Sequence, residues 1–291
     1  MCLNKLLILF LLPIVAIGQS SDSSQSSVDK KGLRRASIAA GAVYTGSLFV
    51  LNKVWYENNE RQSFRFFDDN PEWKQIDKLG HFYSSFYLTY GISRGLQAYN
   101  LRPKKADLIG AIVGFGVLLP IEVFDGFSPA YGASVGDLAA DAAGPLFYLA
   151  QQAIWKDVRL IPKFSFRYTD YAAMRPSVLG SGAERILKDY NGQTYWLSVD
   201  MDKFVRFPKW LNLAVGYGAN GMVYARDAQQ SEYNLSPALR EYYLSLDLDL
   251  SGIRTRSKGV KTLLFVLNMV KIPSPTLRFT SEGTRFFPAF F

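Results

Sequence analysis

The sequence predicts an α+β protein in which a hydrophobic helical bundle is followed by a small antiparallel β region. The first observation is a set of apolar, alanine- and glycine-rich segments of helical length within the first 160 residues. The second is a change beyond Pro162 to short segments in which apolar and polar residues alternate. We therefore expect the bundle over residues 33–160 and the β-rich region over residues 161–291.

Residues 1–18 have the form of a secretory signal peptide. One lysine precedes an apolar run from Leu6 to Ile17, which ends in the small-residue pattern Ala16-Ile17-Gly18. The run is too short for an ordinary membrane span. Residues 19–32 are rich in Ser, Asp and Gln and are expected to form a disordered leader. The only cysteine, Cys2, precedes the apolar run, so we expect an exported chain without a disulfide or a lipidated cysteine.

The chain is basic, with a formal net charge of +8. Basic residues cluster at Lys30–Arg35, at Arg102–Lys105 and at Arg254–Lys261. For an exported protein, anionic lipid or another envelope protein is a better partner than nucleic acid. The simpler alternative is that these clusters are solvated loops and helix ends. The sequence does not define an oligomeric state.

Four apolar helices are expected in the bundle, at Ala36–Asn52, His81–Ser93, Leu108–Ile121 and Ala142–Ile154. Asp107 and Ser134 are expected N-caps, and turn residues precede the third and fourth helices. The helices suit a bundle that is buried either in itself or partly in a bilayer.

His81 is the only histidine, and it stands four positions after Asp77 and three after Lys78. Residues four apart are neighbours on a helix, so Asp77 and His81 are expected to share one face. A carboxylate in this position can hold the imidazole in one tautomer and raise its basicity. The simpler interpretation of Asp77-Lys78 is a solvated helix start.

Two later acidic pairs have helical spacing inside small or apolar sequence: Glu122 with Asp125, and Asp137 with Asp141. Carboxylates inside an apolar bundle are costly unless they are paired or bound to something. We expect both pairs, with Ser134 beside the second, to meet His81 in one polar site. The simpler alternatives are a helix end that leaves the core and a helix start favoured by the macrodipole.

The expected chemistry of this site has two forms. A possible divalent cation would take carboxylate ligands from Glu122, Asp125, Asp137 and Asp141, and such a set with one imidazole suits Mg²⁺, Mn²⁺ or Ca²⁺ better than Zn²⁺. In an enzyme, His81 oriented by Asp77 would act as the general acid or base. The sequence contains no serine nucleophile elbow, no phosphate-binding glycine loop, no His-Glu-x-x-His motif and no cysteine metal site.

The ordered motifs Asp77-Lys78-x-x-His81, Glu122-x-x-Asp125-Gly126 and Ser134-x-x-Asp137-x-x-x-Asp141-x-x-Gly144 resemble a known family. They look like the YfiM-like family of predicted periplasmic lipoproteins, a domain of unknown function, and are more distantly similar to VanZ-like membrane proteins. The similarity covers roughly residues 35–156. It implies an envelope location and a hydrophobic helical fold, without an established chemistry. The chain departs from the lipoprotein description because no cysteine follows the signal run.

Beyond Pro162, four to six strands are expected. The clearest, Tyr195–Asp202 and Tyr242–Asp249, are similar almost residue for residue and lie 47 positions apart, which suggests an internal repeat of two hairpins. Each has an apolar face and a face with two aspartates, which we expect to be solvated, although the aspartates could bind a cation. Lys261–Lys271 is expected to be a short apolar helix.

Three functions remain open from the sequence. The first is a non-catalytic envelope protein, periplasmic or associated with the outer membrane, whose polar cluster organises the bundle or binds a lipid or partner. The second is an enzyme that acts on an envelope lipid or glycan. The third is an outer-membrane barrel protein, which predicts a closed sheet of at least about eight strands.

Overall fold

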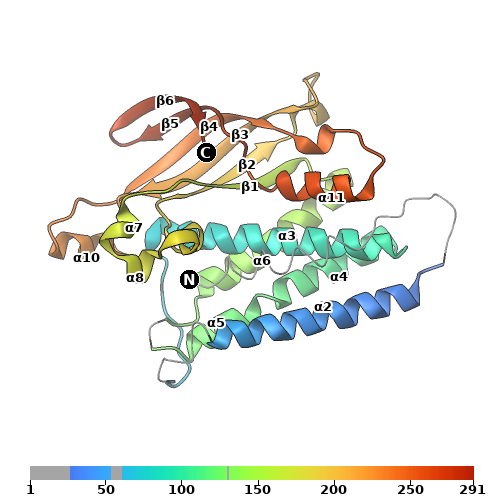
Figure 1. Ribbon diagram of the computed structural model, residues 1–291, viewed down its shortest axis with the longest axis horizontal. Coiled ribbons are helices and arrows are strands. Elements are labelled where there is room, and N and C mark those ends of the chain that lie inside the picture. The colour runs from blue at the N-terminus through green and yellow to red at the C-terminus, as the bar shows by residue number, and fades with distance from the viewer. Residues whose placement is uncertain (1–26, 54–60, 130) are drawn as a thin grey trace. The chain divides into compact units, whose positions relative to one another are not determined.

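The computed structural model describes residues 27–53, 61–129 and 131–291, and it confirms the α+β class (Figure 1). The predicted signal peptide lies outside the described residues, as do residues 19–26 of the predicted leader. Residues 30–32 of that leader are helical, because α2 (Lys30–Leu51) starts directly after the Asp29 cap, whose carboxylate accepts a hydrogen bond from the Gly32 amide.

The chain divides into two compact units. The helical unit contains the described residues up to Asp69 together with His81–Lys156. The sheet unit contains Asn70–Gly80 together with Asp157–Phe291. The boundary between Gly80 and His81 falls inside α3 (Ile76–Ala98), so this helix contributes to both units.

The helical unit consists of α2, most of α3, α4 (Pro103–Gly116), α5 (Leu119–Gly126) and α6 (Val135–Trp155). The helix that the sequence predicts over Leu108–Ile121 is two helices. Pro120 has no backbone N–H to donate to the preceding turn, so a helix does not continue through it. It lies in the first turn of α5, where no such donor is needed. Asp107 is not the expected N-cap, because α4 begins four residues earlier at Pro103.

Small residues let α3 and α6 approach closely. A Cβ at Gly144 on α6 would lie 2.5 Å from the Phe82 carbonyl oxygen and 2.6 Å from the Phe86 nitrogen on α3. The α3 side of the unit is polar, with Ser84, Ser85 and Thr89 fully buried. Large apolar side chains instead face outward on several helices, including Phe49, Ile112 and Leu146. This unit therefore buries several hydroxyl groups among its apolar core residues and exposes large apolar side chains at its surface.

Among the residues that the structure describes, one helical stretch, Pro103–Gly126, is long and apolar enough to cross a membrane by length and composition. It covers both α4 and α5, and about two fifths of its most apolar window is buried within the protein. Buried core helices of soluble proteins meet the same criteria, so this stretch alone does not define a membrane span.

The sheet unit is built on six antiparallel strands that are hydrogen-bonded in sequence order. Their bounds are β1 (Leu160–Phe166), β2 (Gln193–Val199), β3 (Leu211–Asn220), β4 (Leu239–Leu248), β5 (Ser274–Thr280) and β6 (Gly283–Phe290). The helix α11 (Lys258–Leu267) lies between β4 and β5 in the chain and ends four residues before the predicted Lys271. In the part of the chain that the structure describes, β1 and β6 are the sheet's two edges. This arrangement differs from the closed sheet of at least about eight strands that a barrel protein would have.

Short helical segments fill two of the connections. Between β1 and β2 they are α7 (Tyr171–Met174), α8 (Pro176–Leu179) and α9 (Arg185–Lys188). Between β3 and β4 the chain forms α10 (Asp227–Glu232). Residues 70–80, which belong to the same unit, contact these connections: the Trp73 ring packs on Tyr190, and Lys74 pairs with Asp227.

The two similar segments of the sequence are β2 and β4, and they flank the same strand. Tyr195 of β2 and Tyr242 of β4 both pair with Tyr217 of β3. The similarity therefore places equivalent side chains on either side of one central strand. It does not mark two separate hairpins, as the sequence suggested.

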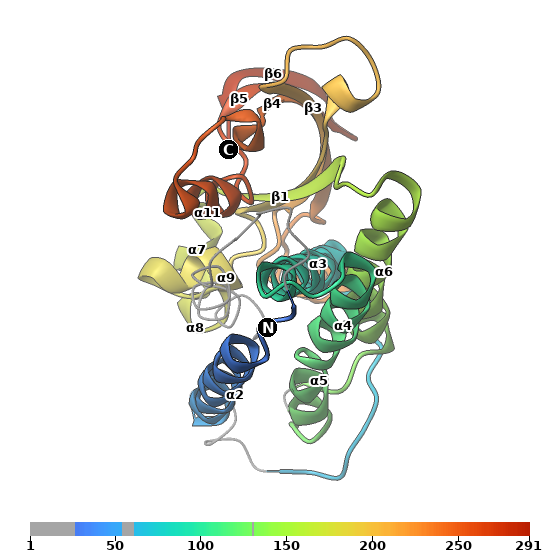
Figure 2. The ribbon, with the colours of Figure 1, turned by 90° about the vertical axis from the view of Figure 1, so that its right-hand side faces the viewer.

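The sheet is strongly curved (Figure 2). Three strands separate β2 from β6, yet the ring centroids of Trp196 and Phe290 are only 6.2 Å apart, and Phe290 also contacts Tyr243 of β4 at 4.8 Å. These aromatic side chains must lie on the concave face, where they form a buried cluster. The concave face is therefore the interior of the unit.

Asp247 and Lys163 lie on this interior face, which corrects the expectation that the aspartates are solvated. Asp247 is fully buried and accepts from Lys163 Nζ at 2.7 Å and from Ser198 Oγ at 2.6 Å. Lys163 also donates to the Leu248 carbonyl and to Asn268 Oδ1. Asp200 and Asp249 are buried too. Burial is tolerated because the carboxylate of Asp247 is paired and hydrogen-bonded.

The opposite face of the sheet is apolar, and on the later strands it is exposed. A single register row crosses all six strands with apolar residues alone: Pro162, Leu197, Val215, Leu244, Leu277 and Phe286. Val215 and Phe286 are 52% and 59% exposed, whereas Asp247 on the other face has no exposed surface. Alternation along the strands was correctly predicted, but the assignment of the two faces was inverted.

Candidate functional site

The only histidine of the chain lies within the helical unit, surrounded by carboxylates from two other helices. His81 is on the second turn of α3, Glu122 is in the first turn of α5, and Asp137 and Asp141 are on α6. Asp137 and Asp141 are one helical turn apart and therefore share a face of α6. All four side chains are buried.

Both ring nitrogens of His81 face carboxylates. Nδ1 lies 3.0 Å from Oδ1 of Asp141, which is a hydrogen bond, and Nε2 lies 3.8 Å from Oδ2 of Asp137. The imidazole is thus held between two residues of the same helix. The hydrogen bond to Asp141 orients the ring; the sequence placed Asp141 in the site without assigning it this role.

The start of α6 brings Glu122 into the same site. Ser134 caps α6, because its Oγ accepts from the Asp137 amide at 3.0 Å, as the sequence predicts. The Ser134 amide in turn donates to Oε2 of Glu122 at 2.8 Å. The Ser134 hydroxyl donates to Oδ1 of Asp69 at 2.5 Å. One residue therefore connects α5, α6 and the segment before α3.

Asp69 was not identified from the sequence. It arrives through an extended segment that runs beside the α5–α6 connection, where the Phe67 amide donates to the Ala133 carbonyl and the Ala133 amide donates to the Arg65 carbonyl. Sequence neighbours of Asp69 show no periodic pattern, so no local signal marks this contact. The only hint is that the acidic pair Asp68-Asp69 is followed by the turn-forming residues Asn70-Pro71.

The charges within the site shift its pKa values in a consistent direction. Burial alone lowers the pKa of His81, but the charges of Asp137 and Asp141, the hydrogen bond to Asp141 and the charge of Glu122 outweigh it and raise the pKa to about 10. Burial raises the pKa of Glu122 to about 8, although His81 opposes this shift. Burial also raises the pKa of Asp141. The site therefore holds more carboxylate charge than one imidazolium compensates.

Three of these residues have the arrangement of a ligand set for a metal ion. One nitrogen of His81 and one carboxylate oxygen each of Glu122 and Asp141 all lie within 4.8 Å of one another. The second oxygen of Asp141, Oδ2, is buried and has no hydrogen-bond partner, and Asp141 has no exposed surface. An unsatisfied buried carboxylate oxygen is costly unless something binds it.

Asp125, Asp77 and Lys78 are the other residues that the sequence predicts for the site. Asp125 is buried one turn after Glu122 on α5, and its charge contributes to the raised pKa of Glu122. Asp77 and Lys78 belong to the sheet unit, where Lys78 Nζ lies 3.4 Å from Oδ2 of Asp77. The structure thus brings together His81, Glu122, Asp137, Asp141 and Ser134 around one point.

A second buried polar network in the helical unit was also missed. Oδ1 of Asp107 accepts from Ser93 Oγ at 2.5 Å and from Tyr148 Oη at 2.9 Å, and Gln97 donates to both Ser93 and Asp107. The sequence assigned Asp107 to a helix start, which hid its position inside α4. In this network Oδ1 of Asp107 has several donors, in contrast to Oδ2 of Asp141.

Comparison with known proteins gives one match. Residues 65–151 match the sequence model of a family described as predicted periplasmic lipoprotein (DUF2279). The matched segment contains every residue of the His81 site, and it ends before β1 of the sheet unit. No curated protein and no solved structure matches the chain. The family description agrees with an exported protein of the periplasm or cell envelope.

Proposed function

We propose that this cell-envelope protein binds one divalent cation inside its helical unit through His81, Glu122 and Asp141. The cation would join α3, α5 and α6 and so organise the bundle. The observation that carries the proposal is the convergence of three ligand atoms within 4.8 Å beside the unpartnered, buried Oδ2 of Asp141. The proposal keeps a YfiM-like and distantly VanZ-like affiliation, supported by the order of the Asp-Lys-x-x-His and acidic motifs.

The charge balance of the site supports a doubly charged ion. Glu122, Asp137 and Asp141 carry three negative charges when ionised. His81 must be neutral to bind the ion through a ring nitrogen, so it offsets none of them. A divalent cation offsets two of the three charges and replaces the proton of His81 as their counter-charge. Carboxylates with a single imidazole favour Mn²⁺, which accepts both hard oxygen ligands and a histidine nitrogen.

A binding role fits the geometry better than catalysis. Catalysis requires that a substrate reach His81, and the apolar pocket between α2, α3 and α4 has none of the four site residues in its lining. His81 and Asp141 are buried, with 5% and 0% of their surface exposed. A cation that stabilises the packing of three helices needs no such access.

The test is titration of the chelator-treated, full-length protein with Mn²⁺, followed by calorimetry and metal analysis. We expect one ion per chain and a higher thermal midpoint. A free Mn²⁺ concentration one hundred times the Kd corresponds to about 2.7 kcal/mol of added stability. Parallel titrations with Mg²⁺, Ca²⁺ and Zn²⁺ identify the preferred ion.

Asp141→Asn and Glu122→Gln are expected to weaken Mn²⁺ binding by about tenfold or more, because each removes a charged ligand. Asp107→Asn is the matched control: it changes a buried aspartate of the same unit that lies in the Tyr148 network. The proposal is wrong if the folded protein binds none of the four ions, or if Asp107→Asn weakens binding as much as Asp141→Asn.

A further inference from the structure

An apolar pocket of about 350 Å³ lies in the helical unit between α2, α3 and α4. Its volume is in the range of small-molecule binding sites. Its walls are almost entirely apolar, and none of the His81 site residues contributes to them. The pocket is therefore a second feature of this unit, separate from the carboxylate cluster.

The α2 wall shows why the space is empty. The lining residues from Leu33 to Tyr44 recur at intervals of three and four, so they occupy one face of α2. All four lining residues between these two are small: Ala36, Ser37, Ala40 and Gly41. These side chains are too short to fill the gap to α3 and α4. Eleven residues of helix separate Leu33 from Tyr44, so the pocket follows α2 for about 16 Å.

The two ends of the pocket differ. At one end the Tyr44 hydroxyl donates to the Val117 carbonyl at 3.0 Å, which joins α2 to the α4–α5 break. At the other end lie Leu33 and Tyr99. There the Asp29 amide donates to the Tyr99 carbonyl at 3.1 Å, so the start of α2 and the end of α3 lie side by side.

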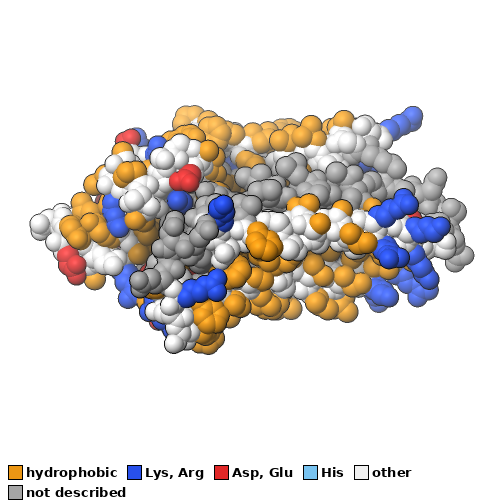
Figure 3. Space-filling view, turned by 60° about the horizontal axis from the view of Figure 1, so that its bottom comes forward, with side chains coloured by type: hydrophobic (Ala, Val, Ile, Leu, Met, Phe, Trp, Pro, Cys, Tyr) orange, Lys and Arg blue, Asp and Glu red, His pale blue; other side chains and the backbone are white. Residues whose placement is uncertain are grey.

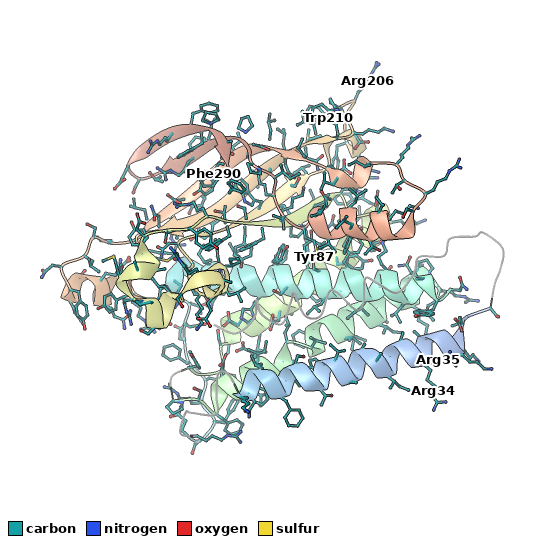
Figure 4. The ribbon with its side chains drawn as sticks, in the orientation of Figure 1. Arg34, Arg35, Tyr87, Arg206, Trp210 and Phe290 are labelled. Atoms are coloured by element: carbon teal, nitrogen blue, oxygen red, sulfur yellow. The ribbon has the colours of Figure 1, made fainter. Side chains whose placement is uncertain are left out.

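The Leu33–Tyr99 end is strongly basic. The first turns of α2 and the start of α4, which follows Tyr99 closely in the chain, carry seven exposed basic residues: Lys30, Lys31, Arg34, Arg35, Arg102, Lys104 and Lys105. Figure 3 shows basic side chains gathered at one end of an otherwise mainly apolar helical surface, and Figure 4 shows Arg34 and Arg35 near the start of α2. A long apolar pocket with positive charge at one end is complementary to a hydrocarbon chain with an anionic head.

We propose that this pocket binds one acyl chain of an anionic lipid, with the lipid head group at the basic start of α2 and α4. The chain would lie along the small-residue face of α2 towards Tyr44. The same chemistry is offered by a phospholipid taken from a bilayer and by a free fatty acid. The inference does not depend on the cation site, since the two share no residue.

The experiment uses the delipidated, full-length protein and native mass spectrometry with phosphatidylglycerol, phosphatidylcholine and palmitate as probes. We expect one bound lipid per chain, and tighter binding of phosphatidylglycerol than of phosphatidylcholine. Binding of palmitate but not of phosphatidylglycerol would identify a free fatty acid as the source of the chain. Equal binding of phosphatidylglycerol and phosphatidylcholine would overturn the role of the basic end.

Two adjacent alanines provide a matched pair of variants. Ala40 lines the pocket and Ala39 is exposed, so Ala40→Phe is expected to weaken lipid binding at least about tenfold, and Ala39→Phe to leave it unchanged. If Ala40→Phe does not fold, Gly41→Leu and Gly46→Leu replace the pair, because a Cβ at either glycine meets no atom within 4 Å and only Gly41 lines the pocket. Equal lipid binding by both members of a pair would overturn the proposal.

Arg34→Gln with Arg35→Gln tests the head-group end separately. These residues are exposed and do not line the pocket. The double variant is expected to reduce the preference for phosphatidylglycerol over phosphatidylcholine by about tenfold while phosphatidylcholine binding stays the same. An unchanged preference would show that the basic end does not hold the head group.

Discussion

Among single residues, Asp200 shows how the interior of the sheet unit treats charge. Its amide donates to the Arg159 carbonyl at 2.8 Å, but its Oδ1 is buried without a hydrogen-bond partner. Burial, a hydrogen bond with Asp202 and the charges of Asp249 and Asp202 raise the pKa of Asp200 to about 7, and Lys203 opposes this shift only in part. The fold therefore favours the protonated form of this side chain.

The raised pKa of Asp200 predicts a loss of stability as the pH rises. The folded state binds this proton up to about pH 7, whereas the unfolded chain releases it near the ordinary value of 3.8. The contribution of Asp200 is therefore complete below the unfolded value and is lost as the pH rises through about 7. Asp200→Asn is expected to stabilise the protein more at pH 8 than at pH 5, measured as the midpoint of urea unfolding. Equal effects at both pH values would show that Asp200 is already ionised at pH 5.

At the scale of elements, α3 and α6 of the helical unit are in close contact. Gly144 permits it, because a Cβ at this position would meet backbone atoms that cannot move independently of α3. The same contact carries Asp141 to His81, since Asp141 lies one turn before Gly144 on α6. Helix packing and the geometry of the polar site are therefore set by the same interface.

Gly144→Ala is expected to destabilise the protein by about 1–3 kcal/mol, because the added methyl group has no space. Gly46→Ala is the matched control in α2, where a Cβ meets nothing within 4 Å. It is expected to be neutral or to stabilise the helix by up to about 1 kcal/mol. Thermal unfolding of both variants checks the difference. Similar midpoints would mean that α3 and α6 are farther apart in solution.

At the scale of the whole molecule, the sheet unit is completed by residues from far away in the sequence. Trp73, Lys74 and Gln75 have φ values of 46°, 51° and 62°, a left-handed turn that is unfavourable for residues other than glycine. Contacts within the sheet unit hold it: the Trp73 amide donates to the Ala225 carbonyl, and the Tyr217 hydroxyl donates to the Lys74 carbonyl. The turn exists because these contacts outweigh its local cost.

Removal of the Trp73 side chain is expected to loosen this attachment. Trp73 is 9% exposed, and its ring packs on Tyr190 at 5.4 Å. Trp73→Ala should cost about 3–5 kcal/mol and accelerate hydrogen exchange in residues 190–240. Trp210→Ala, at a tryptophan of the same unit that is 58% exposed (Figure 4), should stay within about 0.5 kcal/mol of the parent. Equal exchange in the two variants would contradict an anchoring role for Trp73.

The sequence was sufficient for features that depend on local spacing. Helical periodicity placed Asp137 and Asp141 on one face, and the serine cap of α6 was evident at Ser134. The hydrogen bond between His81 and Asp141 was not predictable in this way. Asp141 reaches the ring through tertiary packing of α6, which leaves no trace in local sequence.

The faces of the sheet illustrate a second limit. Alternation in Tyr242–Asp249 defines two faces, but it does not specify which of them is interior. The usual assumption, that leucines are buried and aspartates solvated, failed because Lys163 from another strand neutralises Asp247. Only the pairing of distant strands reveals that arrangement.

The inverted sheet has a consequence for the substitutions that the chain can accept over evolutionary time. At Asp247, Lys163 and Ser198, an apolar replacement of one member leaves the others buried without a partner, so these polar positions are the constrained ones. At Val215 and Leu244, apolar side chains of many shapes fit equally, because nothing within the protein encloses them. A profile of accepted substitutions would therefore show polarity preserved in the interior and size drifting freely on the outside, the reverse of an ordinary water-soluble sheet.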